Sequence, residues 1–98
     1  MLQCSIHGAE DLRIENVPCP QPGPDQALIK MGAAGICGSD MHYFRDGQIG
    51  KFKIKEPLIP GHEASGVIAS LGANVTGLEE RQRVAINPSH PCGTCSRC

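Results

Sequence analysis

The first half of the chain contains two short stretches in which apolar and polar positions follow the pattern of β-strands. Residues 12–17 alternate, with Leu12 and Ile14 on one face and charged side chains on the other. Residues 27–31 are mostly apolar and predict a second strand. The glycine-rich stretch that follows, 32–40, is expected to be flexible because small residues do little to hold a backbone in place.

The second half predicts two more strands. Residues 64–72 are small and apolar, as in a third strand. Its alternation sets three residues on one face: Val67, Ala69 and Leu71. Residues 83–87 predict a fourth strand, with Val84 and Ile86 directed inward.

The segments between these strands are turns, loops and one short helix. Residues 18–26 contain four prolines and are expected to be extended. Residues 47–61 are interrupted by glycine and proline and predict a loop with little regular structure. Residues 40–45 predict a helix, for which Ser39 or Asp40 would be the N-cap.

Short strands separated by turns favour an antiparallel barrel or sandwich over a wound α/β sheet. Four short strands are too few to close a barrel, so we expect strand edges that are left unpaired. The predicted fold class is therefore mainly β with one short helix.

The composition supports this fold class and excludes some functions. Twelve glycines, eight prolines and only three aromatic residues are typical of a turn-rich domain. Nine Lys and Arg residues against ten Asp and Glu residues predict neither a nucleic-acid partner nor a single-sign face that would steer a charged partner. The sequence shows no membrane-length apolar run and no secretory signal, so we expect a cytoplasmic protein without a membrane partner.

The six cysteines are better explained by metal binding than by disulfides, because no secretory signal accompanies them. Cys92, Cys95 and Cys98 lie three residues apart, and Gly93 supplies the freedom that a tight turn between ligands needs. A structural zinc requires four ligands, of which this run provides three. Iron–sulfur clusters use similar spacings and unrelated thiols are a further alternative, but we predict zinc.

A second group of residues with metal-binding chemistry lies in the middle of the chain. Cys37 and His62 are of the types that zinc prefers, and both follow or precede glycines. Glu63 is either a third ligand or a base beside the metal. Asp40 is suited to accept the imidazole N–H of a ligating histidine.

Ser39 and His42 add a route for protons to this second group. A serine hydroxyl can pass a proton from a metal-bound substrate to an imidazole near bulk water. Taken singly these residues are unremarkable, since a lone cysteine is usually a small core residue and a lone histidine is usually exposed or hydrogen-bonded.

Three stretches together resemble the N-terminal domain of the zinc-dependent medium-chain alcohol and polyol dehydrogenases: residues 35–52, 61–75 and 83–98. Counting the residues between them, the resemblance extends from about Cys4 to Cys98. The Gly-His-Glu sequence and the cysteine run are its most specific features.

Within that family, the sequence is most similar to the branch of the sorbitol, xylitol and L-idonate dehydrogenases. The variant Cys-Gly-Ser-Asp-x-His-Tyr at 37–43 and the loop 47–52 are features of this branch, and residues 85–95 resemble the L-idonate enzymes in particular. Tyr43 and Phe52 either line the substrate pocket or pack within loops.

The resemblance implies a GroES-like partial barrel in which residues 1–98 are the N-terminal part of a catalytic domain. It implies that Cys37, His62 and Glu63 hold a catalytic zinc, and that Ser39 and His42 relay the proton of a secondary hydroxyl. Hydride would pass to NAD or NADP in a further domain. In the alcohol dehydrogenases proper, however, the residue that matches Glu63 lies outside the ligand set.

By the same resemblance, the three C-terminal cysteines are part of a four-cysteine structural zinc site. Because only three are present, we expect this zinc to bind weakly or to recruit a cysteine from another chain. The family usually has a glycine in the turn at 80–82, where this sequence has Glu80-Arg81-Gln82. Arg81 must then adopt a conformation that glycine adopts more easily.

The residues of a dinucleotide-binding domain, including its glycine-rich fingerprint, do not occur within 1–98. We therefore expect the chain to be a piece of a longer, homo-oligomeric enzyme that acts on a small polyol or sugar acid, and to be inactive alone. The alternative is a small zinc-binding module without catalysis.

Overall fold

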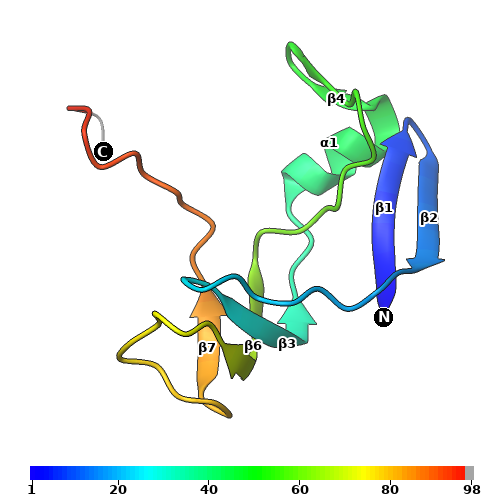
Figure 1. Cartoon of the computed structure of the whole chain (residues 1–98). Coiled ribbons are helices and arrows are strands. Elements are labelled where there is room, and N and C mark those ends of the chain that lie inside the picture. Colours follow the sequence, from blue (N-terminus) through cyan, green and yellow to red (C-terminus); the bar gives the residue numbers. More distant parts are fainter. Residues whose placement is uncertain (97–98) are drawn as a thin grey trace.

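The structure is a computed structural model that describes residues 1–96, which form seven short strands and one helix (Figure 1). Cys98, one of the three predicted structural zinc ligands, lies outside the described residues. The elements, in chain order, are β1 Leu2–Gly8, β2 Asp11–Asn16, β3 Ala27–Ala34, α1 Gly38–Asp46, β4 Gln48–Ile49, β5 Phe52–Lys53, β6 Ala64–Leu71 and β7 Arg83–Ile86.

The strands form three separate antiparallel sheets among the described residues. β1 pairs with β2, β4 pairs with β5, and β6 lies between β3 and β7. A single bridge between Ile6 and Leu58 joins the first hairpin to the segment that precedes β6. The prediction of a mainly β, antiparallel and incompletely closed fold with one short helix is confirmed.

The small core depends on a strand that the sequence reading did not predict. Ile6 of β1 and Ile68 of β6 are each 1% exposed, and Ser5 of β1 is fully buried. The signal for β1 was present in the sequence, because Leu2, Cys4 and Ile6 alternate with polar residues along the strand, but it was overlooked.

β6 buries the face opposite to the one that carries Val67, Ala69 and Leu71. Gly66 and Ile68 are buried, whereas Ala69 is exposed and Val67 only half-buried. Gly66 explains part of this, because a Cβ there would collide with the Lys30 carbonyl oxygen of β3. The close approach of the two strands therefore turns the even-numbered positions of β6 inward.

Two other predicted apolar faces remain largely open to solvent. In β2, Leu12 is 45% exposed and Ile14 is 62% exposed. In β7, Val84 is half-buried, but Ile86 is 39% exposed, so only part of the inward prediction holds.

The helix is longer than predicted and begins earlier. α1 starts at Gly38, with Cys37 rather than Ser39 or Asp40 at the N-cap position. Asp40 instead lies in the first turn, where its carboxylate accepts a hydrogen bond from the Cys37 N–H at 2.9 Å. This hydrogen bond satisfies a backbone donor at the start of the helix, as the acidic side chain of a capping box does.

The two glycine-rich stretches are more ordered than predicted. β3 continues through residues 32–34, where it pairs with the start of β6. Residues 47–61 include the small hairpin of β4 and β5. The hairpin follows directly from the end of α1, because Gly47 takes a left-handed conformation with φ 65°.

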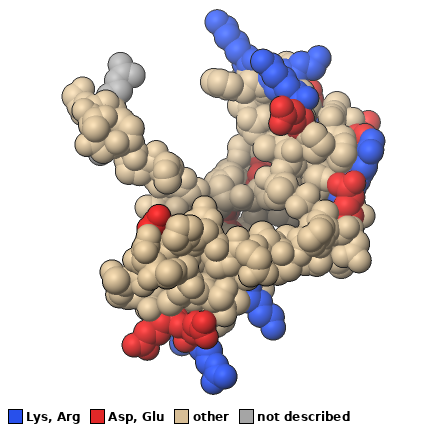
Figure 2. Space-filling view, viewed as in Figure 1, with Lys and Arg blue, Asp and Glu red and all other residues tan. Residues whose placement is uncertain are grey.

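The molecule is open in shape rather than compact. Its radius of gyration is 15.6 Å, above the value of about 13 Å for a compact domain of 100 residues. Figure 2 shows a hollow between the lower sheet and the upper part that holds α1 and the hairpins. Within residues 1–96, no helix has the length and apolar character needed to cross a membrane.

Candidate metal centre

Cys37 is held at the point where the chain leaves β3 and enters α1. Its backbone is extended, with φ −85° and ψ 159°, and the helix begins at the next residue. The Asp40 carboxylate fixes this turn through the Cys37 N–H. The thiol is half-buried as a result.

His62 and Glu63 lie side by side directly before β6. Gly61 precedes them with φ 105°, a conformation that residues with side chains rarely adopt. The Gly61 N–H donates a hydrogen bond to Asp40 Oδ1 at 3.3 Å. Asp40 therefore accepts backbone hydrogen bonds from both of the segments that carry the predicted ligands.

A second backbone contact joins the same two segments. The Gly35 N–H donates to the Glu63 carbonyl oxygen at 2.6 Å, next to the pairing of Ala34 with Ala64. Gly35 also makes room for the Glu63 side chain, because a Cβ at Gly35 would lie 2.5 Å from Glu63 Oε2. Neither role of Gly35 was predicted, and both depend on contacts with a residue 28 positions away.

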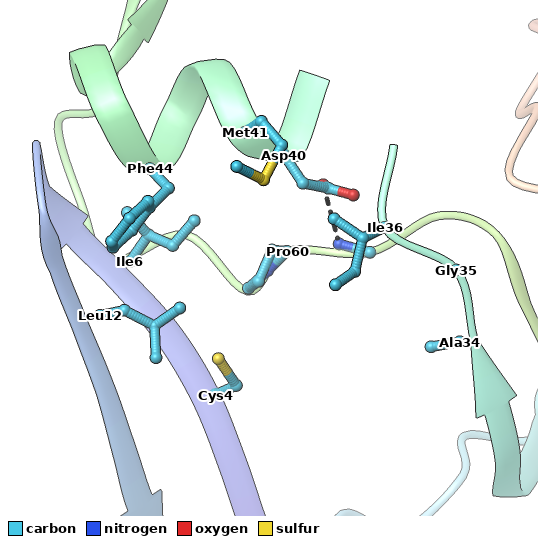
Figure 3. A pocket seen from close by; sticks show the side chains of 11 residues that line it. Cys4, Ile6, Leu12, Ala34, Gly35, Ile36, Asp40, Met41, Phe44 and Pro60 are labelled. Atoms are coloured by element: carbon cyan, nitrogen blue, oxygen red, sulfur yellow. Dashed lines mark hydrogen bonds between the residues drawn. The ribbon is translucent and has the colours of Figure 1, made fainter. Parts of the chain in front are cut away.

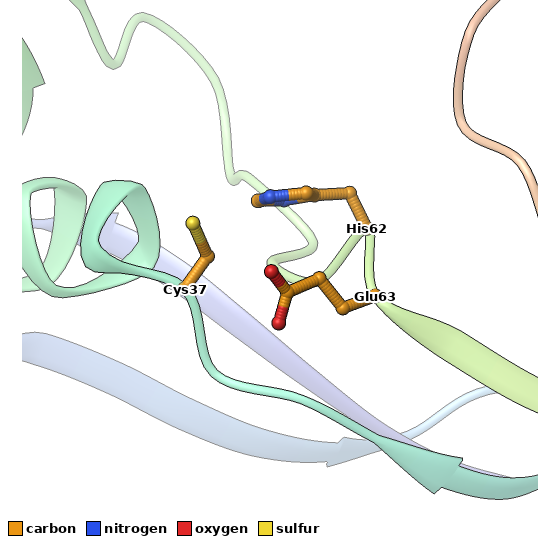
Figure 4. Close-up of side chains that lie close together, drawn as sticks. All are labelled: Cys37, His62 and Glu63. Atoms are coloured by element: carbon orange, nitrogen blue, oxygen red, sulfur yellow. The ribbon is translucent and has the colours of Figure 1, made fainter.

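The predicted ligands Cys37, His62 and Glu63 converge. One potential ligand atom from each lies within 4.8 Å of the other two, and Figure 4 shows the three side chains directed at a common space. Cys37 and His62 are half-buried, and Glu63 is exposed. Thiolate, imidazole and carboxylate together form a donor set that zinc accepts, and three protein ligands leave a fourth position for water or substrate. The residues present therefore fit a zinc ion.

The protonation of the group also favours metal binding by the thiolate. Hydrogen bonds from the backbone N–H and hydroxyl of Ser39, and then one from His62, lower the pKa of Cys37, although burial and the charge of Glu63 oppose this. The hydrogen bond with Cys37 raises the pKa of His62, and the charges of Asp40 and Glu63 act in the same direction.

Asp40 lies near the His62 ring, but beyond hydrogen-bonding distance, so the predicted hydrogen bond from the imidazole N–H is not formed. Asp40 Oδ1 is 3.9 Å from His62 Nδ1, and the Asp40 side chain is only 14% exposed. The carboxylate is thus close enough to influence the imidazole electrostatically while it holds the two backbone segments together.

Ser39 and His42 both lie on α1, but they have different surroundings. Ser39 contacts the Cys37 sulfur through the hydrogen bonds described above. The His42 side chain is 68% exposed, and its Nδ1 lies 3.3 Å from Asp46 Oδ2. Residues three apart on a helix share a face, so Ser39 and His42 lie on the same side of α1.

The predicted structural zinc site is only partly described. Cys92 and Cys95 are exposed in the C-terminal segment that follows β7, and the Thr94 hydroxyl donates to Cys92 Sγ at 3.6 Å. Since Cys98 lies outside residues 1–96, this zinc site stays a prediction.

A cavity of about 370 Å³ opens beside the metal centre (Figure 3). α1 contributes Asp40, Met41 and Phe44 to it, and β1 lies opposite. Its remaining lining is mostly apolar: Cys4, Ile6, Leu12, Ala34, Gly35, Ile36, Pro60 and Gly61. Neither Tyr43 nor Phe52 lines this cavity, so their proposed contact with substrate is not supported by it.

Comparisons with known proteins agree with this arrangement. The sequence profile described as "Alcohol dehydrogenase GroES-like domain" matches residues 23–98. Sorbitol dehydrogenase of Gallus gallus is 50% identical over 93 residues, which make up 95% of this chain and 26% of the relative. The chain thus spans about a quarter of the length of this relative.

Solved structures of sugar-acid and polyol-phosphate dehydrogenases are similar as well. L-idonate 5-dehydrogenase from Escherichia coli superposes with a TM-score of 0.82 at 36% identity, covering 99% of this chain and 27% of that one. Galactitol-1-phosphate dehydrogenase from Escherichia coli gives a TM-score of 0.86 at 28% identity, covering 100% and 28%. With a profile match over more than three quarters of its residues, the chain belongs to the alcohol dehydrogenase GroES-like domain family.

Proposed function

We propose that this chain is the zinc-binding part of the catalytic domain of a dehydrogenase that oxidises a secondary hydroxyl of a polyol or sugar acid to a ketone. The observation that carries the proposal is the convergence of Cys37, His62 and Glu63 within 4.8 Å. Family membership and the similarity to sorbitol and L-idonate dehydrogenases support it.

In this proposal Cys37, His62 and Glu63 would hold a zinc ion close to the substrate hydroxyl. Bound zinc supplies a Lewis acid that lowers the pKa of that hydroxyl. Asp40 accepts hydrogen bonds from the N–H groups of Cys37 and Gly61, and thereby fixes the position of Cys37 relative to His62. A site assembled before substrate arrives avoids the free-energy cost of ordering its groups during the reaction.

Ser39 and His42 provide the proton path in this proposal. The Ser39 hydroxyl lies beside Cys37 and takes the proton released at the centre. His42 is exposed, carries Asp46 as a partner for its protonated form, and passes the proton to bulk water. The hydride leaves for a nicotinamide cofactor, NAD or NADP, bound by a dinucleotide-binding domain outside residues 1–98. The isolated segment is accordingly proposed to have no turnover of its own.

The test uses the enzyme that carries this segment together with a cofactor domain. Reduction of NAD or NADP is followed with L-idonate, sorbitol and xylitol, before and after removal of zinc by a chelator. We expect turnover of at least one substrate that is lost on chelation and restored by zinc. Absence of turnover with all three, or turnover that survives complete removal of zinc, would contradict the proposal.

A matched pair of cysteine variants separates the metal centre from general effects of losing a thiol. Cys37→Ser is expected to lower kcat/KM on the order of 10³-fold, since a metal contributes several kcal/mol to charge stabilisation. Cys19→Ser removes an exposed thiol in the proline-rich loop and is expected to leave kcat/KM unchanged.

A further inference from the structure

Four exposed cations gather around the hairpin that follows α1. Figure 2 shows Lys and Arg side chains concentrated at the top of the molecule, where Figure 1 places this hairpin. We call this group the basic hairpin; its cationic residues are Arg45, Lys51, Lys53 and Lys55. None of the four lies within 4.0 Å of a carboxylate of the described residues, whereas Arg13 pairs with Asp11 at 2.7 Å.

The basic hairpin carries an excess of positive charge that the overall balance of the chain concealed. Residues 45–56 contain four cations against two acids, a net charge of +2, whereas the whole chain has a net charge of −1. One of the two acids, Asp46, faces His42 at 3.3 Å. The total composition does not reveal this local excess of positive charge.

The basic hairpin is attached firmly to the helix that carries Cys37 at its N-cap. The Gly47 N–H donates to the Tyr43 carbonyl at 3.0 Å, and the Ile54 N–H donates to the Gly47 carbonyl at 2.9 Å. Across the hairpin, Gln48 pairs with Lys53. These contacts hold the lysines in a defined place relative to α1.

The basic hairpin also lies between the two ligand segments along the chain. α1 leads from Cys37 to the hairpin, and residues 54–61 lead back from it to His62. A nine-residue helix is about 13 Å long. This exceeds the Debye length of about 8 to 10 Å at physiological salt, so the hairpin charges act on a solute at the centre mainly at low salt, and at physiological salt they act on a solute that passes close to the hairpin.

The candidate centre itself offers little attraction to an anion. The Cys37 thiolate and the Glu63 carboxylate supply two negative charges. Together they neutralise the two positive charges of one divalent cation, so the loaded centre has no net charge. A neutral polyol needs no further charge, whereas an anionic substrate is drawn in only by cations elsewhere on the surface.

We propose that the basic hairpin recruits the anionic group of the substrate, so that the enzyme prefers polyols bearing a carboxylate or a phosphate ester over neutral polyols. This inference rests on the proposed function and names the substrate class of the same site. Lys51, Lys53 and Lys55 act as specificity-determining residues through their charge, without a part in hydride or proton transfer.

The test compares charged and neutral substrates in the enzyme with its cofactor domain. Lys51, Lys53 and Lys55 are all changed to Gln, and kcat/KM is measured at low and at physiological ionic strength. For L-idonate we expect a loss of about tenfold at low salt that shrinks as salt is added, in line with electrostatic steering. For sorbitol we expect a change of less than about twofold. Galactitol 1-phosphate compared with galactitol shows whether phosphate serves in place of carboxylate.

The matched control changes Lys30, Arg81 and Arg83 to Gln. These three cations are also exposed and lack an ion pair within residues 1–96, but they lie on and beside the β3–β6–β7 sheet. The control alters net charge by the same amount and is expected to leave the preference for L-idonate intact. Equal loss in the two triple variants, or no loss in the hairpin variant, would overturn the inference while the dehydrogenase proposal stands.

A binding measurement decides the inference separately from turnover. L-idonate is titrated into the metal-free wild-type protein and both triple variants, and backbone amide shifts of residues 45–55 are followed. Loss of these shifts in the hairpin variant alone supports recruitment of the anion, even if the enzyme were to turn over none of the substrates. Unchanged shifts in the hairpin variant would overturn it.

Discussion

Arg81 occupies a backbone conformation that suits glycine. Its φ is 69°, and its N–H donates to the Ile68 carbonyl at 2.9 Å, so the turn before β7 is fixed by a contact to β6. The departure from the family pattern at this position predicted such a strain. A side chain in the left-handed region costs about 1–2 kcal/mol, whereas the extra freedom of glycine in the unfolded chain costs about 0.5–1 kcal/mol.

The strain should exceed the entropy cost, so Arg81→Gly is expected to stabilise the protein by about 0.5–1 kcal/mol. Denaturant unfolding of the wild type and the variant measures this. Arg83→Gly is the control, because Arg83 lies in β7 and is not among the residues with positive φ. It should destabilise by a similar amount. A loss of stability in Arg81→Gly would show that the arginine side chain contributes more than its conformation costs.

Ser5 is a fully buried residue whose hydroxyl has two polar neighbours, Glu15 on the paired strand β2 and His7 on its own strand β1. Ser5 Oγ donates to Glu15 Oε2 at 2.7 Å and lies 3.2 Å from His7 Nε2. The hydrogen bond from Ser5 is the main reason that the pKa of Glu15 lies below its ordinary value, and His7 acts in the same direction.

Ser5→Ala is therefore expected to raise the pKa of Glu15 toward its ordinary value, as followed by NMR of the side-chain carboxyl. Because the folded-state pKa is lowered, the stabilisation from this contact is present above the unfolded pKa of Glu. It is lost as pH falls through the lower folded value. The pKa of Asp11, which is lowered mainly by Arg13, serves as the control and should not move. An unchanged Glu15 pKa in Ser5→Ala would contradict the assignment.

At the scale of elements, Asp40 joins the start of α1 to the segment before β6. It accepts the N–H of Cys37 at 2.9 Å and that of Gly61 at 3.3 Å. Removal of one charge and one acceptor should loosen both ligand segments together. Residues around a metal ligand set typically change metal affinity about 10–100-fold when altered.

Asp40→Asn is accordingly expected to weaken zinc binding about tenfold or more, as measured by competition with a coloured chelator. Asp46→Asn, in the last turn of the same helix, removes the same charge far from the ligands and should have little effect. Equal affinities in the wild type and Asp40→Asn would show that this link does not position the ligands.

Gly35, between β3 and α1, leaves room for the side chain of Glu63. A Cβ there would meet Glu63 Oε2 at 2.5 Å and Glu63 Cβ at 3.1 Å. The closest atom is the end of a flexible side chain, so Gly35→Ala should displace the Glu63 carboxylate while the fold is kept.

We expect Gly35→Ala to lower zinc affinity about tenfold and to leave the circular dichroism spectrum unchanged. Gly38→Ala is the matched control, since a Cβ at Gly38 meets nothing within 4 Å. If Gly35→Ala binds zinc as tightly as Gly38→Ala, Glu63 is not a zinc ligand. That outcome would agree with the arrangement expected for alcohol dehydrogenases proper.

The elements themselves were predictable where local pattern decides them. The structure contains the predicted strands at 12–17, 27–31 and 83–87 and the helix near 40–45. These elements depend on local signals, namely the alternation of apolar and polar residues and the glycines and prolines that end an element. β1 was overlooked although Leu2, Cys4 and Ile6 alternate with polar residues, whereas the buried face of β6 depends on tertiary packing. Ile6 and Ile68 become core residues only when distant strands meet.

The candidate ligands were predictable, but the contacts that position them were not. Cys37, His62 and Glu63 stand out by residue type and by their neighbouring glycines. The link from Asp40 to Gly61, by contrast, joins residues 21 positions apart through a backbone N–H, which leaves no pattern in the sequence. The basic hairpin was missed for a related reason, since composition averages charge over the whole chain.

At the scale of the molecule, the described residues form an open structure with a small core. Leu2, Ile36 and Phe52 are each more than three quarters exposed. This agrees with the proposal that the segment works as part of a larger enzyme.

The central claim is that Cys37, His62 and Glu63 bind one zinc ion, and a crystal of the zinc-loaded enzyme tests it most directly. An anomalous difference map recorded at the zinc absorption edge should show a peak bonded to all three side chains. The expected distances are about 2.3 Å from the cysteine sulfur and about 2.0–2.2 Å from the histidine nitrogen and the glutamate oxygen. No peak at this position in a fully loaded crystal, or a peak that lacks any one of the three side chains among its ligands, would contradict the account.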